Sequence, residues 1–411
     1  MPKGLRVRLP PSAPLMSRIK NILRSIRIEE YILFIFSIML FLSCLIFSPQ
    51  LSWLDSFRNG FGNVILGIKY FLIVFVFAFY YIFFKLYLYL IHWLSPFINK
   101  EKSLKILLLT WLKGFSQSCS KIKNNFLGIF FFLRPVFPIV LFFTLVTFLI
   151  GLMAFQLKDN LVDDQLMKID KSMFGSYPFF WLQNPANFLR YLAPLFLYSF
   201  SFLGLLIGIS WLFLFLNRSR KFFSQYVIAT TLVIMISLPF WFLFPANSPQ
   251  NAYLNNVYSK EIDSSIKKSV EDYRTNEFLL RFYENVGVKP GDIAPVTTMP
   301  SLHVAWAIII VYYLFKFRKK TVYFTLPWAT FSSLGAVYLG QHYFIDVLVS
   351  LPVAFIAIGL TGYLFKIEKR YYRANRLDKQ EESFKEQIKK DLALIPKAIR
   401  SVCPGKKVKS F

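Results

Sequence analysis

The chain has 411 residues, of which 55% are hydrophobic and only 17% are charged, and its 48 Lys and Arg against 22 Asp and Glu give a formal net charge of +26. This charge alone would fit a nucleic-acid-binding protein, but a soluble core stops growing near about 250–300 residues and cannot bury so much apolar surface. The same apolar share excludes a disordered chain, so the composition indicates a polytopic membrane protein without a nucleic-acid partner.

Apolar runs of about 18 or more residues, each long enough for a helix to cross a bilayer, recur along the chain. We predict eight transmembrane helices, at residues 31–48, 64–92, 129–157, 191–216, 226–246, 301–317, 321–339 and 344–366. No small-residue cleavage site follows the first run, which is therefore expected to be a retained span. The shorter apolar segment 104–118 carries Lys105 and Lys113 and is expected to lie along the membrane surface. The predicted fold class is all-α, a polytopic membrane helix bundle.

Lys and Arg residues in the connecting segments predict the orientation, because basic loops resist translocation and stay cytoplasmic. Five segments are rich in these residues: the N-terminal arm, residues 93–128, the turns near 218–221 and 316–320, and the tail after residue 363. With eight spans threaded in order, all five segments fall on one side of the membrane, which places both termini in the cytoplasm. The loops 158–190 and 247–300 then face the periplasm, a lumen or the cell exterior.

The long outer loop 247–300 is expected to hold structure of its own, since structureless loops of this length are uncommon in compact proteins. Its apolar residues include a set that fits one face of an amphipathic helix, Ile262, Ile266, Val270 and Tyr273. Such a helix would lie on the outer interface as a lid, and a partly ordered loop is the alternative. The basic tail 367–411 is expected to lie on anionic lipid headgroups.

Two of the three histidines fall at the outer ends of predicted spans. His303 begins the sixth span, and His342 lies where the seventh span turns into the eighth, four residues before Asp346. Topology alone therefore puts these three side chains at one depth on the outer face. His92, at the cytoplasmic end of the second span, has no acidic or histidine neighbour in the pattern and is expected to be an interfacial residue.

The spacing of these residues favours phosphoryl transfer. If the eighth span begins as a helix before His342, the histidine and Asp346 share one face, and the carboxylate can accept the Nδ1 hydrogen of the imidazole. That contact leaves Nε2 as a nucleophile. Ser301, directly after Pro300, is expected to cap the sixth span, whose free backbone N–H groups favour an anion nearby.

The order Pro300-Ser301-Leu302-His303 followed by His342-x-x-x-Asp346 resembles the type 2 phosphatidic acid phosphatase superfamily. It is closer to the branch that contains fungal inositol phosphorylceramide synthase, in which Leu replaces the Gly of the phosphatases' Pro-Ser-Gly-His. Two further stretches, 169–175 and 244–249, are similar to a loop and to the end of a span in that branch.

The resemblance covers about residues 130–366 and implies a six-helix catalytic core. Residues 1–129 would then be an added module, made of the basic arm, two spans and the surface segment, and residues 367–411 a basic cytoplasmic tail.

The sequence departs from the superfamily in its arginines. The phosphatases' first motif, Lys and six variable residues before Arg-Pro, has no match on the outer side, and Arg134-Pro135 lies at the cytoplasmic end of its span. Ala336 stands where the phosphatases carry an Arg six residues before the nucleophile, and Gln250 where some bacterial relatives carry one. The candidate substrate-binding residues are therefore Ser301, Asn247, Gln250, Tyr338 and Gln341, with Arg190, Lys168 and Lys171 as replacement cations from the outer loop.

The resemblance implies a two-step mechanism. His342 attacks phosphorus and forms a phosphohistidine, Asp346 stabilises the imidazolium, and His303 protonates the departing oxygen before it deprotonates the incoming hydroxyl. This scheme needs no metal and no other cofactor. The implied enzyme moves a phosphoryl group or a phospho-headgroup from a phospholipid to an alcohol acceptor.

Other interpretations stay open on the sequence alone. A phosphatase that acts on a lipid phosphate or a polyprenyl diphosphate would use the same residues with water as acceptor, although Leu302 and the missing arginines favour the transferase. The cluster could also be structural, or belong to a transporter or an inactive relative, but transporters place charges near mid-membrane and these spans are nearly free of them. A zinc site lacks a further ligand pattern. The oligomeric state is undetermined.

Overall fold

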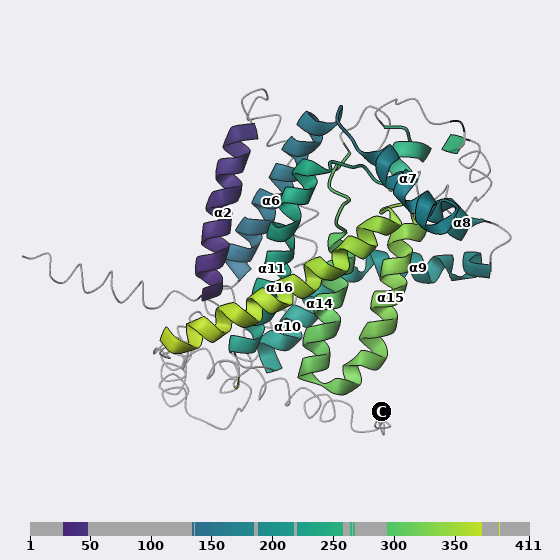
Figure 1. The fold of residues 1–411 in the computed structure, drawn as a ribbon. Coiled ribbons are helices and arrows are strands. Elements are labelled where there is room, and N and C mark those ends of the chain that lie inside the picture. The colour runs from purple at the N-terminus through teal and green to yellow at the C-terminus, as the bar shows by residue number, and fades with distance from the viewer. Residues whose placement is uncertain are drawn as a thin grey trace, which may run out of the picture.

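The computed structural model describes residues 28–47, 134, 136–184, 188–217, 220–257, 264, 266–267, 294–371 and 386. These residues are helical apart from their connections and one isolated bridge. Their helices are α2 (Ile28–Phe47), α6 (Val136–Leu157), α7 (Asp163–Phe174), α8 (Pro178–Gln183), η1 (Phe188–Leu192), α9 (Ala193–Ser201), α10 (Leu203–Asn217), α11 (Arg220–Leu243), η2 (Gln250–Leu254), α14 (Leu302–Phe317), η3 (Lys319–Thr321), α15 (Val322–Tyr338) and α16 (Phe344–Tyr371). Figure 1 shows the long helices as a bundle, with α7 and α8 gathered at one end of it.

Among the described residues, four helices are long and apolar enough to cross a membrane, Ile28–Ile46, Pro138–Leu157, Phe222–Leu243 and Phe344–Ile367. A bent helix pair would add a fifth. α14 and α15 have 16 and 17 residues, which makes them shorter than the roughly 30 Å hydrocarbon core at 1.5 Å per residue. An all-helical membrane bundle is thus supported, while the count of eight spans stays a prediction. The predicted span 64–92 and the surface segment 104–118 lie outside the described residues.

The fourth predicted span, 191–216, is not one straight helix. It is divided at Phe202 into α9 and α10, and the helix pair bends by 47° there. α9 packs against α15, where Gly335 lets the two backbones meet, because a Cβ at this glycine would lie 2.7 Å from the carbonyl oxygen of Phe196. α10 turns away and packs against α11 and α14. The bend therefore lets one apolar run serve two packing partners.

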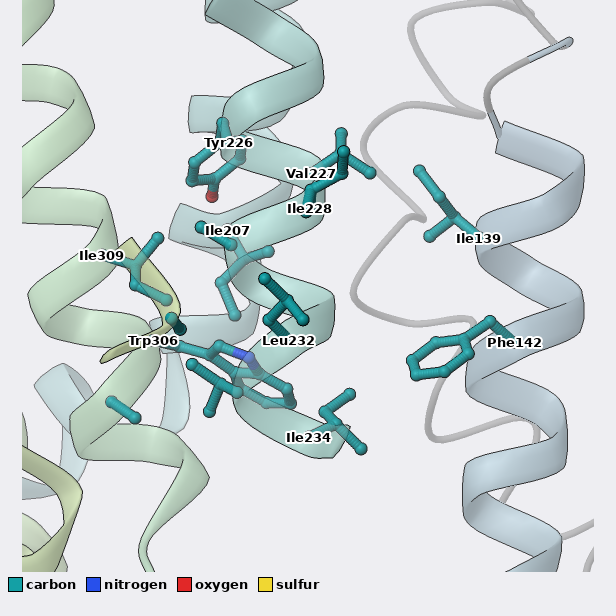
Figure 2. Packing of buried hydrophobic residues seen from close by; sticks show 14 of the residues in the cluster. Ile139, Phe142, Ile207, Tyr226, Val227, Ile228, Leu232, Ile234, Trp306 and Ile309 are labelled. Atoms are coloured by element: carbon teal, nitrogen blue, oxygen red, sulfur yellow. The ribbon is translucent and has the colours of Figure 1, made fainter. Parts of the chain in front are cut away.

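The main core lies between α6, α10, α11 and α14, and it is built from branched aliphatic and aromatic side chains. Figure 2 shows Trp306 of α14 directed at α11, with Ile139 and Phe142 of α6 on the opposite side of α11. The Trp306 indole donates a hydrogen bond to the carbonyl of Thr230, at 3.1 Å. Because the indole N–H has a partner, this large ring can be buried without leaving an unsatisfied polar group.

The first described helix is joined to the core by an ion pair. The guanidinium of Arg134, two residues before α6, donates from Nε and Nη2 to the two carboxylate oxygens of Glu30 in α2, at 2.6 and 2.8 Å. α2 packs along α6 beyond this pair, as their adjacent positions in Figure 1 also show. Arg134 is thus engaged at the start of α6 and, as its sequence position predicts, at the end of that helix opposite to α7.

The expected lid helix around residues 262–273 lies mostly outside the described residues. Of its four apolar residues, Ile266 is described, and it is buried beside Leu166 and Met167 of α7 and Tyr253 of η2. The basic tail lies outside the described residues too, apart from the end of α16 and Glu386.

Candidate active site

The start of α14 is built as its sequence predicts. Ser301 has an extended backbone, with φ −71° and ψ 111°, and its hydroxyl accepts a hydrogen bond from the N–H of Val304 at 3.4 Å. Ser301 is therefore the N-cap of α14, and His303 follows in the first turn. A serine at this position satisfies one of the backbone donors that every helix leaves unpaired at its start.

The turn between α15 and α16 carries His342. It closes on the carbonyl of Ala336, which accepts hydrogen bonds from the backbone N–H groups of Gln341 at 2.9 Å and of His342 at 3.0 Å. Gly340 has a φ of +63° and lies so close to Phe179 that a Cβ would meet that ring at 2.4 Å. Only glycine accommodates both the left-handed backbone and this contact without strain. The position that holds Arg in the phosphatases is thus a buried alanine whose carbonyl shapes the turn.

His342 contacts a backbone carbonyl more closely than it contacts Asp346. Its Nδ1 lies 3.0 Å from the carbonyl oxygen of Thr298 and 3.4 Å from Oδ2 of Asp346. The sequence-based expectation made Asp346 the acceptor, on the assumption that the helix begins before His342. Because α16 begins only at Phe344, the spacing of four does not stack the two side chains as it would within a helix.

The two acceptors at Nδ1 determine the state of the imidazole. A carbonyl can only accept a hydrogen bond, so Nδ1 carries the hydrogen and Nε2 holds the lone pair. Burial lowers the pKa of His342 to about 4, and the hydrogen bond to Thr298 opposes that shift. The ring is consequently neutral at pH 7, the state that a nucleophilic nitrogen needs.

His303 faces His342 across the site. Their ring centroids are 6.0 Å apart and their planes are inclined by 58°. On its other side, His303 stacks on Phe200 of α9, with the centroids 4.3 Å apart and the planes inclined by 17°. The two imidazoles are thus near enough to contact one phosphoryl group, and Phe200 holds one of them from behind.

α14 and α16 are tied together directly behind the histidines. The hydroxyl of Ser350 lies 2.9 Å from the carbonyl oxygen of Ser301 and 2.6 Å from that of Asp346. The N–H of Ser301 also donates to the Asp346 carbonyl, at 3.4 Å. Asp346 itself is fully buried, and its Oδ2 accepts the backbone N–H of Tyr343 at 2.9 Å. These bonds fix the two histidine-bearing segments relative to each other.

The amide residues predicted to bind substrate surround the His342 turn. The side-chain nitrogen of Gln341 donates to the side-chain oxygen of Gln250, whose backbone N–H donates to the carbonyl of Gly340 at 2.9 Å. Asn247 is fully buried, and its Nδ2 has no hydrogen-bond partner within the described part of the chain.

Tyr338, the remaining predicted substrate-binding residue, lies deeper than the amides. Its ring packs against Phe196, and its backbone carbonyl accepts a hydrogen bond from the side chain of Gln183.

The three outer cations lie on exposed surfaces of α7 and η1. Arg190 stacks over the ring of Tyr191, 4.7 Å from its centroid, and donates to the same tyrosine's hydroxyl. Lys171 places its ammonium 5.0 Å from the centroid of Tyr177, and Lys168 is exposed on α7. Their role as phosphate ligands stays a prediction. Within the described residues, no group of three or more His, Cys, Asp or Glu side chains has the arrangement of a metal site.

The site is recessed along the bundle axis. Tyr313 packs against Phe222 and Tyr226, and Trp306 bonds to Thr230, so α14 runs antiparallel to the first half of α11. By this register, α11 extends past the start of α14 by roughly 13 Å at 1.5 Å per residue. Residues 294–300 descend through that distance, paired with Ala246 through the hydrogen bonds of Val296 and Thr298; Figure 1 shows this segment as the extended connection above α14.

Part of the chain matches a known family. Residues 164–360 match the PAP2 superfamily. The match starts inside α7 and ends inside α16, so it contains the two histidines and Asp346 described above, and it covers just under half of the chain. Within the PAP2 superfamily the match does not single out the inositol phosphorylceramide synthase branch. No curated protein and no solved structure matches the chain. The PAP2 match and the apolar helices together indicate a membrane enzyme of the lipid phosphatase or phosphotransferase kind.

Sequence reasoning missed four contacts of the site. It assigned the Nδ1 acceptor to Asp346 and overlooked the carbonyl of Thr298, the hydroxyl of Ser350 and the ring of Phe200. It treated Asp170 only as part of a resembling loop, although its carboxylate bonds to the start of α16. Position 343 gave a signal for this last contact: the residue before the helix is Tyr, which is a poor N-cap, so the acceptor must come from elsewhere.

Proposed function

We propose that this protein is an integral membrane phosphotransferase that moves a phosphoryl group or phospho-headgroup from a phospholipid to an alcohol through a phosphohistidine. The observation that carries the proposal is the facing pair of His303 and His342, 6.0 Å apart, with the Nδ1 hydrogen of His342 held by Thr298. A held Nδ1–H directs the lone pair of Nε2 to substrate, and a second imidazole at this distance can serve the leaving oxygen.

Both steps balance with these residues alone. Nε2 of His342 forms a bond to phosphorus while the bond from phosphorus to the leaving oxygen breaks, and His303 gives that oxygen a proton. The imidazole of His342 is then cationic, and the carboxylate of Asp346, 3.4 Å from Nδ1, stabilises it. In the second step His303 takes the proton of the acceptor hydroxyl, whose oxygen bonds to phosphorus as the bond to Nε2 breaks.

The composition of the site supports a transferase over a phosphatase. Gln250 and Ala336 occupy two places where arginines bind phosphate in relatives, and Gln250 pairs with the amide of Gln341. Neutral amide donors suit a phosphodiester, which carries one negative charge, better than a terminal phosphate with two. A phosphodiester lipid is the donor that a headgroup transferase uses, and a lipid phosphate is the substrate of the alternative enzyme.

A lipid substrate fits the surroundings of the site. A small apolar pocket lies between α6, α10, α11 and α14, and it is lined by Ile139, Phe143, Ile207, Trp211, Tyr226, Val227, Thr230, Thr231 and Trp306. Trp306 lies one helical turn beyond His303, so the wall of the bundle directly beyond the site along α14 is apolar, as a lipid substrate requires. We infer that the site opens to the periplasmic, lumenal or extracellular face and that both termini are cytoplasmic, because the basic start of α11, at Arg220 and Lys221, and the basic turn 316–320 lie at the other end of the bundle.

The test begins with alanine variants of the three histidines, purified in detergent and compared at equal concentration. We expect His342→Ala to lose all measurable turnover and the acid-labile label that a phospholipid labelled at phosphorus leaves on the enzyme. His303→Ala should reduce kcat by about 10²- to 10⁴-fold, as loss of a general acid does. His92→Ala is the matched control and should retain full activity. Turnover that survives in His342→Ala would end the nucleophile assignment.

A second arm separates transferase from phosphatase. The labelled phospholipid is incubated with the wild-type enzyme, with and without a lipid or sugar alcohol. We expect labelled product to appear on the alcohol and to require it. Release of free phosphate at the same rate in both reactions would identify water as the acceptor and the enzyme as a phosphatase.

A further inference from the structure

The first turn of α16 lacks a capping side chain of its own. A helix leaves its first backbone N–H groups without intrahelical partners, and Ser, Thr, Asp or Asn just before the helix usually accepts from one of them. The residue before α16 is Tyr343, whose side chain cannot do this. The turn that carries His342 directly precedes this start, so an uncapped α16 would leave the nucleophile on a frayed end.

Asp170 of α7 supplies the missing cap from a distant part of the chain. Its Oδ2 accepts the N–H of Phe344 at 2.8 Å, and its Oδ1 accepts the N–H of Ile345 at 2.9 Å. Asp346 reaches back to the N–H of Tyr343 at 2.9 Å. The backbone N–H groups of the three residues after His342 therefore all donate to carboxylates, the first to Asp346 and the other two to Asp170. A carboxylate at this place also interacts favourably with the positive end of the helix dipole.

A second carboxylate on the same face of α7 holds the neighbouring residue. Asp163, seven residues before Asp170, accepts the hydroxyl of Tyr343 at 3.1 Å and the backbone N–H of Asn247 at 2.7 Å. Residues seven apart lie on one face of a helix. α7 thus contacts all three residues that follow His342, through Asp163 at the first and Asp170 at the other two.

We propose that Asp163 and Asp170 are positioning residues for His342. Through them, α7 restrains the turn that carries His342 and keeps Nε2 of the imidazole oriented toward the phosphorus of the substrate. The inference rests on the proposed function for its effect on turnover, but the capping itself does not. α7 lies outside the long apolar helices, against the end of the bundle where α16 begins (Figure 1). A rigid helix bonded to the turn limits movement of the imidazole, and a displacement of about 1 Å at a reacting group can cost roughly 10²-fold in rate.

The environment of Asp170 makes its capping of α16 dependent on pH. The side chain is buried, and burial raises its pKa to about 6; the bonds from Phe344 and Ile345 oppose this shift, while the charge of Asp346 adds to it. The titratable side chains that the neighbouring elements bring to α7 are Asp346 of α16, Tyr343 before it and Tyr253 of η2, and α8 carries none. Protonation of Asp170 turns one acceptor oxygen into a donor, so one backbone N–H loses its partner as the pH falls through about 6. Burial holds the pKa of His342 lower, at about 4.

The central experiment replaces Asp170 with Asn, which keeps the size and one acceptor but presents an NH₂ to the second backbone donor. We expect kcat to fall by about 10²-fold, with KM changed by less than about threefold, because the orientation of the His342 imidazole is altered and the lipid contacts are not. The acid limb of kcat near pH 6 should disappear in this variant. Asp159→Asn, an exposed carboxylate in the turn before α7, is the matched control and should behave as wild type.

Hydrogen–deuterium exchange tests the cap independently of any reaction. In Asp170→Asn the amides of residues 343–346 should exchange at least tenfold faster than in the wild type and in Asp159→Asn. Tyr343→Phe removes the hydroxyl that donates to Asp163 and contacts Tyr253, and it leaves the Asp170 cap intact. We expect a smaller loss of kcat, about tenfold, and this variant provides the test if Asp170→Asn fails to fold. Unchanged exchange at residues 343–346, or unchanged kcat in both variants, would contradict the positioning role of Asp163 and Asp170. If His342→Ala remained active while the exchange result held, the proposed reaction would be wrong and the cap correct.

Discussion

At the scale of single residues, backbone groups contribute as much to the site as side chains do. The imidazole of His342 is oriented by a carbonyl, the turn before it closes on a second carbonyl, and Ser350 joins two more. Buried carbonyls and N–H groups need partners, so each of these bonds is also a structural requirement. These backbone hydrogen bonds therefore determine the positions of the two histidines.

The Ser350 hydroxyl is a single group whose loss should affect catalysis. Ser350→Ala removes the link between the Ser301 and Asp346 carbonyls, and we expect kcat to fall about tenfold as α14 and α16 lose this connection. The free energy of unfolding should fall by only about 1 kcal/mol, because both carbonyls keep backbone donors. Ser333→Ala is the control, since its hydroxyl bonds within α15 alone. Equal kcat in the two variants would show that Ser350 does not position the site.

The sequence predicted which side chains meet but not what holds them. Threading the spans brought His303, His342 and Asp346 to one end of the bundle, because residue identity and span order are enough for that. The carbonyl of Thr298 could not be predicted, since every residue carries a carbonyl and only the backbone path decides which one faces Nδ1. Asp170 could not be placed either, because its partners in α16 are 174 and 175 positions away.

At the scale of elements, the α15–α16 turn has a backbone conformation that tolerates little change at Gly340. Gly340 combines a positive φ with the close contact to Phe179, while the helices on either side are ordinary apolar helices. The turn's bonds to Ala336 and Gln250 depend on that backbone conformation. A change at Gly340 therefore reaches His342 directly, two residues later.

Gly340→Ala should strongly impair both stability and turnover. The added Cβ meets the Phe179 ring and the backbone must leave the left-handed region, and strain of this kind costs about 1–3 kcal/mol before any repacking. Gly359→Ala in α16 is the matched control, because no atom lies within 4 Å of its new Cβ and its φ is helical. Thermal unfolding in detergent and kcat measure both effects. A Gly340→Ala protein as stable and active as Gly359→Ala would contradict this account of the turn.

Element boundaries followed the apolar runs where packing agreed with them. The predicted spans 31–48, 129–157 and 344–366 have counterparts in α2, α6 and α16. The break at Phe202 was not predicted, because hydropathy is continuous across it and only the separate partners of α9 and α10 require a bend. α14 lies where the sequence predicts a span. The site is recessed because of the register between α14 and α11, which a single sequence does not encode.

At the scale of the whole molecule, the part of the chain before the PAP2 match is attached to the part that matches. The sequence predicts residues 1–129 as an added module, and α2 from this segment packs along α6, which also precedes the match, and against α11, which lies inside it. The Glu30–Arg134 pair is bidentate, and the two side chains are only 14% and 12% exposed. Such a pair fixes both the position and the rotation of one helix against another, because both hydrogen bonds must align.

Breaking this pair should loosen α2 without disturbing the reaction. Glu30→Gln removes the carboxylate charge that lies 2.6 Å from a largely buried guanidinium, and we expect a loss of about 2–4 kcal/mol in the free energy of unfolding, measured in detergent. The double variant Glu30→Arg with Arg134→Glu should recover part of it, since it restores the pair in reverse, whereas Lys320→Gln, at an exposed position, should cost nothing measurable. kcat of the folded Glu30→Gln protein should match the wild type, because Arg134 lies at the end of α6 opposite to α7 and the site. A loss no greater than that of Lys320→Gln would mean that apolar packing alone holds α2, and a fall in kcat would mean that α2 supports the site through α6.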